Sequence, residues 1–273
     1  MVTKRKELIK AICFTLSIIC SIMLIPIALA GNDDGNEEEV SVWWIEEYPD
    51  PVEDLEWAEY TAKGFYDGMN SRGDWTKRYN KGNDDAWEVH FEKSAVWGWD
   101  SSYVDDVDFV WFDGHGSPWI LLFEDDHDGD GSQTEGLYNT EANWGDKDLE
   151  WIVCSACSVL QENGVVDRWG EEAFHGLHTM LGFHTGRWSK VYWVLWPIWY
   201  RSAGDVYAQF MLDNEYSVVY AWEVMTKNWQ PSDVYGAYLS VQENEHEYLP
   251  GINDGPEDDV DDPEYFEYSR WQC

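Results

Sequence analysis

Residues 107–117 read VDFVWFDGHGS, and residues 149–157 read LEWIVCSAC. Both runs are rich in aromatic and β-branched residues and are bounded by Gly or Asp, which is typical of buried strands. Neighbouring parallel strands deliver their C-terminal residues to one edge of a sheet, where open α/β folds place their sites. We therefore expect one edge to hold the His115 imidazole and the Cys157 thiol, which are the parts of a cysteine nucleophile and its base.

Strand-like and helix-like segments alternate along the rest of the chain. This alternation predicts an α/β fold with a mostly parallel central sheet that is flanked by helices. Residues 71–100 remain ambiguous apart from one short strand, and residues 235–241 are expected to form the final strand. Further strands are expected at 42–45, 87–91, 119–123, 180–184 and 191–196, and helices at 51–70, 168–178, 205–212 and 217–228.

The N-terminal 30 residues have the parts of a secretory signal. Basic residues precede an apolar run that ends in Ala28-Leu29-Ala30, a pattern of export and cleavage. The alternative is an uncleaved anchor, because the run is about as long as one membrane span. Both interpretations place the rest of the chain outside the cytoplasm. We expect a signal peptide or anchor over 1–30, an acidic lead-in over 31–40, an α/β domain over 41–250 and an acidic tail over 251–273, with 265–273 docked on the domain.

The charge of the chain excludes some partners. Without the four basic residues and one acidic residue of positions 1–30, 13 of the 17 basic and 53 of the 54 acidic residues remain, a net charge of −40. Such a surface repels nucleic acid and anionic membranes and attracts cations or basic substrates. Adaptation to salty surroundings is an equally good explanation of the same charge. The 19 Trp and 16 Tyr predict a folded core rather than a disordered polyanion.

The exported part of the chain keeps three cysteines, Cys154, Cys157 and Cys273. Three thiols do not make a disulfide framework, so at least one thiol is a candidate reactive group. Cys154 lies three positions before Cys157 and points to the opposite face of the strand, which predicts a core residue.

The order of the two motifs resembles the caspase-like cysteine peptidases (clan CD), a group that includes caspases, legumains, clostripain and gingipains. The resemblance is carried by residues 109–117 and 151–157, and the 42-residue separation of His115 and Cys157 also suits the family. Helices around 210–222 resemble a prokaryotic gingipain-like branch, so the similarity extends from about residue 40 to 245. The resemblance implies a three-layer caspase-like sandwich.

The same resemblance implies an endopeptidase that acts on peptide or protein substrates by acyl transfer to a thiolate. Cys157 would be the nucleophile, and His115 the acid and base that protonates the leaving amine. The backbone N–H groups of Gly116 and Cys157 would form the oxyanion hole. The chain departs from the family soon after the nucleophile, where members usually carry a small residue, often Gly, and this sequence has Ser158-Val159-Leu160.

An acidic loop between the two motifs resembles the first half of a calcium-binding EF-hand loop. Asp126, Asp128 and Asp130 alternate before Gly131, and Glu135 could supply a further carboxylate. The prediction is a calcium ion that orders a loop near the active site. An acidic exposed turn without a metal is the alternative.

Three other interpretations compete with the peptidase. His175, His178 and His184 could bind zinc, but no HExxH motif is present and ordinary polar or core roles are preferred. A non-catalytic binding domain on the same scaffold is the main rival function. A Trp-rich secreted protein that binds or hydrolyses glycans is the next, and it predicts an exposed row of Trp beside a carboxylate pair. The sequence predicts membrane contact only through an uncleaved N-terminal segment.

Overall fold

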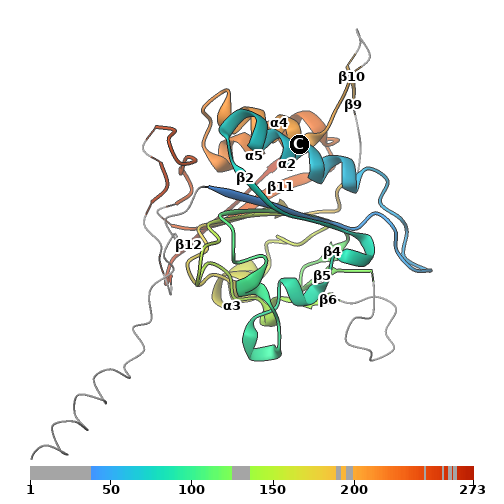
Figure 1. The fold of residues 1–273 in the computed structure, drawn as a ribbon, viewed down its shortest axis with the longest axis vertical. Helices are drawn as coiled ribbons and strands as arrows, with labels where there is room; N and C mark the ends of the chain where they lie inside the picture. Colours follow the sequence, from blue (N-terminus) through green and yellow to red (C-terminus); the bar gives the residue numbers. More distant parts are fainter. Residues whose placement is uncertain are drawn as a thin grey trace, which may run out of the picture.

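The centre of the molecule is a seven-stranded sheet (Figure 1). The structure, a computed structural model, describes residues 38–124, 136–188, 192–194, 199–242, 244–253, 255–257, 260 and 263–273. Strands β2, β1, β3, β7 and β8 run parallel to one another, and β11 and β12 are antiparallel additions beside β8. The prediction of a mostly parallel α/β sheet is confirmed. The strand order is β12 (Phe266–Gln272), β11 (Tyr235–Val241), β8 (Thr179–Phe183), β7 (Trp151–Ser155), β3 (Phe109–Asp113), β1 (Glu39–Trp44) and β2 (Thr76–Gly82).

Strands β3 and β7 lie at the middle of the sheet and are buried along their whole length. Their side chains alternate between two hydrophobic cores. Trp111 and Trp151 pack on one face with the helices, whereas Phe112 and Cys154 pack on the other. Because both faces are covered, each strand is a continuous apolar run rather than an alternating one.

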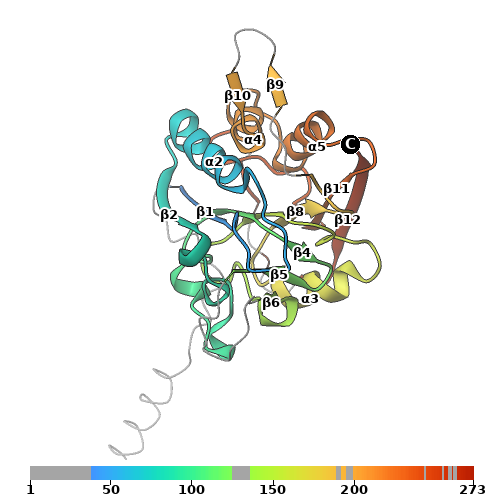
Figure 2. The same cartoon turned by 90° about the vertical axis from the view of Figure 1, so that its right-hand side faces the viewer.

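Three helices cover the first face of the sheet (Figures 1 and 2). They are α2 (Ala58–Gly73), α4 (Ala203–Leu212) and α5 (Val218–Trp229). Ser202 and Ser217 cap α4 and α5 by accepting the backbone N–H three residues on. A Cβ at Gly204 would lie 2.2 Å from the Thr61 carbonyl oxygen, so glycine allows the close contact between α2 and α4.

The second face is covered by short elements and loops (Figure 1). Trp144 and Trp169 stack there with ring centroids 5.9 Å apart, and both are fully buried. A two-stranded sheet of β9 (Tyr192–Val194) and β10 (Trp199–Arg201) projects beyond the helical face (Figure 2). The elements of the second face are β4 (Gly116–Ser117), β5 (Ile120–Leu122), β6 (Gly136–Tyr138), the π-helical turn Val166–Gly170, α3 (Glu171–Ala173) and 3₁₀ turns at Asn83–Asp85, Glu88–His90, Ser94–Val96, Asp100–Ser102 and Asn139–Glu141.

Three predicted elements differ from the structure. The predicted strand 87–91 is the 3₁₀ turn Glu88–His90, where the His90 Nδ1 accepts the Trp87 N–H at 3.2 Å. The predicted helix 51–70 begins only at Ala58, and the Glu46 carboxylate accepts the Glu59 N–H at its start. The predicted helix 168–178 is the π-helical turn Val166–Gly170 followed directly by α3, and it ends at Ala173.

The two sides of the sheet carry strands that the patterns did not predict. Strand β2 is polar and largely exposed, so it lacks the hydrophobic signal of a buried strand. The chain also has a strand after 235–241: β12 pairs with all seven residues of β11. The expectation that residues 265–273 dock on the domain is confirmed, and the sheet therefore extends past residue 250. Among the described residues, no helix has the length and apolar character needed to cross a bilayer.

Two buried carboxyl groups lie in the segment just before β3. Asp105 accepts the backbone N–H groups of Gly145 at 2.6 Å and Leu149 at 3.3 Å, and so joins this segment to the one before β7. Asp100 is only 3% exposed and accepts the Ser101 N–H at 2.7 Å. Burial raises the pKa of Asp100 to about 7.

We expect Asp100→Asn to flatten the pH dependence of stability. The folded pKa of Asp100 lies above that of a free carboxyl, so the folded state holds a proton between about pH 4 and 7 that the unfolded state has lost. The free energy of unfolding should therefore fall as pH rises through this range. Denaturant unfolding should show that the free energy of unfolding of the variant, relative to that of the wild type, is about 1–3 kcal/mol higher at pH 8 than at pH 5. Asp85→Asn, at an exposed position, is the matched control, and equal pH profiles for the two variants would contradict the prediction.

Candidate active site

His115 and Cys157 leave the sheet at the same edge. His115 follows the end of β3 by two residues, and Cys157 follows the end of β7 by two residues. The two strands are parallel neighbours with Asp113 opposite Ser155, and Gly114 N donates to the Ser155 carbonyl at 3.2 Å. A tight turn, in which Ala156 N donates to the Cys154 carbonyl at 2.7 Å, carries Cys157 out of β7. Both side chains are half-buried, so they are accessible from solvent.

The His115 ring is held on two sides. Its Nε2 lies 2.6 Å from the Glu53 carbonyl oxygen, so this nitrogen carries the proton and donates it. Its ring centroid lies 4.7 Å from that of Tyr48, at an angle of 56°. The Tyr48 hydroxyl accepts the His115 N–H at 2.8 Å and donates to the Leu122 carbonyl at 3.1 Å, and burial raises the pKa of Tyr48. In this tautomer Nδ1 has the lone pair that a general base uses.

Cys157 is flanked by the segment that follows β8. The Arg187 backbone N–H donates to Cys157 Sγ at 3.4 Å. Ser158 N donates to the Thr185 carbonyl at 2.9 Å, and a Cβ at Gly186 would lie 4.0 Å from Sγ. The segment 184–188 therefore forms one wall beside the thiol.

Gly116 lies against the turn that bears Cys157. A Cβ at Gly116 would lie 2.9 Å from Ala156 Cβ and 3.1 Å from the Ile120 carbonyl oxygen. Leu122 N donates to the His115 carbonyl at 3.0 Å, so the pair Gly116–Leu121 is a non-hydrogen-bonded pair of the β4–β5 ladder. The Gly116 N–H consequently points away from β5, as an oxyanion donor must.

A buried ion pair lies at the same edge. The Arg187 guanidinium bonds the Asp113 carboxylate, and their side chains are 5% and 0% exposed. Burial raises the pKa of Asp113 to about 6, against the opposing effects of Arg187 and of hydrogen bonds from Trp111 and Ser155. Asp113 is therefore ionised at neutral pH, and its charge balances that of Arg187.

The other two cysteines do not join His115 and Cys157 at this edge. Cys154 is fully buried, and burial raises its pKa, as expected for a core residue. Cys273 is half-buried at the end of β12. The candidate calcium ligands Asp126, Asp128, Asp130 and Glu135 lie outside the described residues. Within the described part of the chain, no group of three or more His, Cys, Asp or Glu side chains has metal-binding geometry.

Two histidines of the zinc hypothesis, His178 and His184, have separate polar neighbours. His178 Nδ1 lies 2.7 Å from Glu247 Oε1, and both side chains are buried. His184 accepts the Glu162 N–H at 3.1 Å and contacts Arg270.

Ser158 directly follows Cys157, at the start of the stretch Ser158-Val159-Leu160 where the resemblance leads us to expect a small residue, often Gly. Its φ is +57°, in the left-handed region that favours glycine. Val159 and Leu160 are fully buried and belong to the core on the second face. The segment that follows Cys157 in the chain therefore consists of a strained serine and two core residues.

We expect Ser158→Gly to raise the free energy of unfolding by about 0.5–1 kcal/mol. Glycine adopts a positive φ without the steric cost that a Cβ brings, and this gain exceeds its larger chain entropy in the unfolded state. Thermal melts of the two proteins would measure the change. Ser94→Gly, in a 3₁₀ turn without a positive φ, should destabilise the protein, and a loss of stability in both variants would contradict the explanation.

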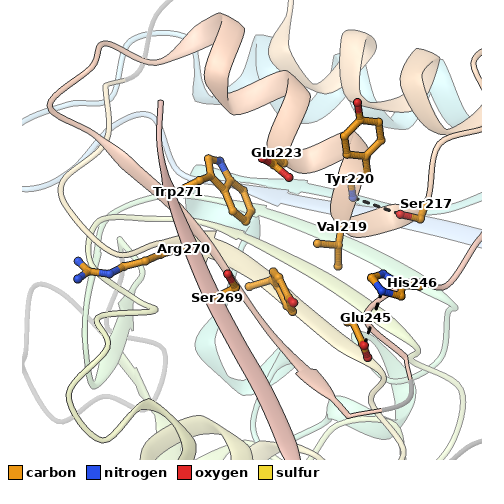
Figure 3. Close-up of a pocket in the computed structure, with 10 residues that line it drawn as sticks. Ser217, Val219, Tyr220, Glu223, Glu245, His246, Ser269, Arg270 and Trp271 are labelled. Carbon is orange, nitrogen blue, oxygen red and sulfur yellow. Dashed lines mark hydrogen bonds and ion pairs between the residues drawn. The ribbon is translucent and has the colours of Figure 1, made fainter.

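A cavity of about 430 Å³ lies away from this edge, between α5 and the strands β11 and β12 (Figure 3). Glu223, Glu245 and Trp271 line it, whereas His115 and Cys157 do not. The side chain of Arg270 extends away from the cavity (Figure 3). It pairs with Glu162 at 2.9 Å. Among the tryptophans, Trp271 lines the cavity.

Sequence reasoning missed the residues that support His115 and Cys157. Tyr48, Glu53 and Arg187 have no local motif, and each contacts the site across a long sequence separation. Arg187 and Asp113, for example, are 74 residues apart. Only the position of Asp113 at the end of a buried strand gave a signal in the sequence.

Most of the chain matches the sequence pattern of one protein family. Residues 42–265 match the model of a domain of unknown function, DUF6345, so the chain belongs to this family. The matched range includes His115, Cys157 and Arg187 and ends just before β12. No curated protein matches the chain.

Proposed function

We propose that this DUF6345 member is an exported cysteine endopeptidase with the caspase-like three-layer sandwich. In this proposal Cys157 is the nucleophile and His115 is the acid and base. The observation that carries it is the shared edge: the two residues follow adjacent parallel strands by the same number of positions. The basic start of the chain and the apolar run of residues 11–30 support export, with cleavage or with retention as a membrane anchor.

The contacts at the edge support a complete acyl-transfer reaction. His115 Nδ1 takes the thiol proton, and the Cys157 thiolate attacks the peptide carbonyl carbon to form a C–S bond. The N–H groups of Gly116 and Cys157 donate to the oxygen that becomes negative. The C–N bond then breaks while His115 returns the proton to the leaving amine. A water molecule then gives a proton to His115 and attacks the thioester carbonyl carbon. The C–S bond breaks, the carboxylic acid leaves, and His115 returns the proton to Cys157 Sγ.

The charge of the chain supports peptide or protein substrates with basic residues, because a net charge of −37 attracts them over long range. Calcium belongs to the proposal as a cofactor of the loop between β5 and β6, which contains Asp126, Asp128, Asp130 and Glu135. Strand β5 pairs with β4, directly after His115. The described residues that flank this loop include the pair Leu122 and Gly136, and Leu122 N donates to the His115 carbonyl at 3.0 Å. We therefore expect calcium to affect the His115 side of the site.

The proposal is tested by labelling with chloromethyl ketone peptides that carry Lys, Leu or Asp at the reactive end. We expect covalent labelling of the wild type, strongest with Lys, and loss of labelling in Cys157→Ala. Addition of calcium or of a chelator in parallel samples tests the cofactor. Peptide mapping of the adduct identifies the modified residue.

Cys273→Ala is the matched control, because Cys273 is the other half-buried thiol among the described residues. It should label like the wild type. Equal labelling of Cys157→Ala and the wild type, or an adduct on Cys273, would refute the peptidase. A wild type that no peptide probe labels would favour the rival function, a non-catalytic binding domain on the same scaffold.

A further inference from the structure

The ion pair between Arg187 and Asp113 spans the end of the strand that delivers the thiol. Asp113 ends β3, and Arg187 follows β8 in the chain. In the sheet order β8-β7-β3 these two strands are the neighbours of β7 on either side. A bond between them therefore crosses the edge where β7 ends and Cys157 begins.

Stability alone gives a weak reason for this pair. Desolvation of two charges offsets much of their attraction, and well-packed apolar residues are often as stable or more so. Here both side chains are buried, at 5% and 0% exposure. The same residue also contacts the thiol, because the Arg187 backbone N–H donates to Cys157 Sγ at 3.4 Å.

We infer that Arg187 is a positioning residue for the nucleophile: its ion pair with Asp113 holds its own backbone N–H against Cys157 Sγ. A hydrogen bond to the charged form of an acid favours that form, so this N–H stabilises the thiolate. The inference rests on the proposed role of Cys157 as the nucleophile. Asp113 balances the guanidinium charge, so position, rather than net positive charge, is what the pair supplies.

The rate of Cys157 alkylation tests this role without any peptidase assay. Iodoacetamide is added to the full chain with the Cys273→Ala background, and each cysteine is quantified by mass spectrometry between pH 6 and 9. Arg187→Met and Asp113→Asn should each slow Cys157 alkylation at pH 7 by about 3- to 10-fold, the loss of one ordinary hydrogen bond. Arg187→Lys, which can keep the ion pair, should restore most of the rate.

The same experiment contains its folding control. Cys154 is fully buried, so its alkylation reports opening of the core, and it should stay slow in every variant used. Arg270→Met removes another arginine of the sheet, which pairs with Glu162, and should leave the Cys157 rate unchanged.

Two outcomes would overturn the inference. One is wild-type alkylation of Cys157 in a folded Arg187→Met protein. The other is faster alkylation in Asp113→Asn, because an uncompensated guanidinium would then act by its charge and not by the position of its N–H. Failure of the peptidase itself is distinguishable, because it would appear as absence of peptide labelling while the alkylation rates still separate the variants.

Discussion

Replacement of His115 by alanine should lower kcat/KM for peptide cleavage by about 10²- to 10⁴-fold, the usual contribution of a general acid and base. In the proposed mechanism, the substitution removes the proton acceptor for the Cys157 thiol and the proton donor for the leaving amine. The Nε2 bond to the Glu53 carbonyl and the contact with Tyr48 show that the ring is fixed in one orientation. A fluorogenic peptide with a basic residue before the cleaved bond is the substrate of choice.

The control for this variant is His246→Ala, because the His246 side chain is 90% exposed and lines the separate cavity. It should cleave at the wild-type rate. Thermal melts must show that His115→Ala is folded, since the ring also packs on Tyr48. Unchanged cleavage by a folded His115→Ala protein would remove His115 from the mechanism.

Replacement of Glu247 by alanine should destabilise the fold by about 3–5 kcal/mol, as expected when one partner of a buried polar pair is removed. Glu247 accepts the Trp151 indole N–H at 2.7 Å and the Glu257 backbone N–H at 2.8 Å, and it also bonds His178. The alanine variant removes the acceptor for all three groups at once. A fall in melting temperature of roughly 6–20 °C would be the measured result.

Two further variants separate this network from a general effect of charge. Glu47→Ala removes an exposed carboxylate and, in so acidic a chain, should leave the melting temperature within about 2 °C. Glu247→Gln keeps one acceptor oxygen and should lose less stability than Glu247→Ala. Equal melting temperatures for Glu247→Ala and the wild type would mean that the buried network contributes nothing.

The centre of the fold could be predicted because burial leaves a pattern in the sequence. Strands β3, β7, β8 and β11 are continuous apolar runs, and helices α4 and α5 begin after serine caps. The edges of the sheet could not be predicted in this way. Strand β2 is mostly polar and is the outermost strand on its side of the sheet, so it lacks the apolar run of a buried strand. Strand β12 follows a long acidic segment that gives no strand signal.

The candidate site could be predicted only as far as its two reactive side chains. The ends of two apolar runs indicate where His115 and Cys157 emerge, and their side-by-side position follows from the parallel pairing of β3 and β7. Their supports come from loops that no periodicity connects: Glu53 reaches His115 from 62 residues away, and Arg187 reaches Cys157 from 30. Such contacts depend on the paths that the loops take after the strands end.

Strand β12 gives the chain a property that no part of the site reveals. It pairs with β11 over seven residues and is the outermost strand on its side of the sheet. A chain cut before residue 265 would therefore present β11 as an open template for intermolecular pairing. The same cut makes the missing strand a ligand, because a peptide with the sequence FEYSRWQ could fill the vacant position by strand complementation. We therefore expect β12 to limit self-association through β11 in the intact chain and, supplied as a peptide, to bind the truncated chain.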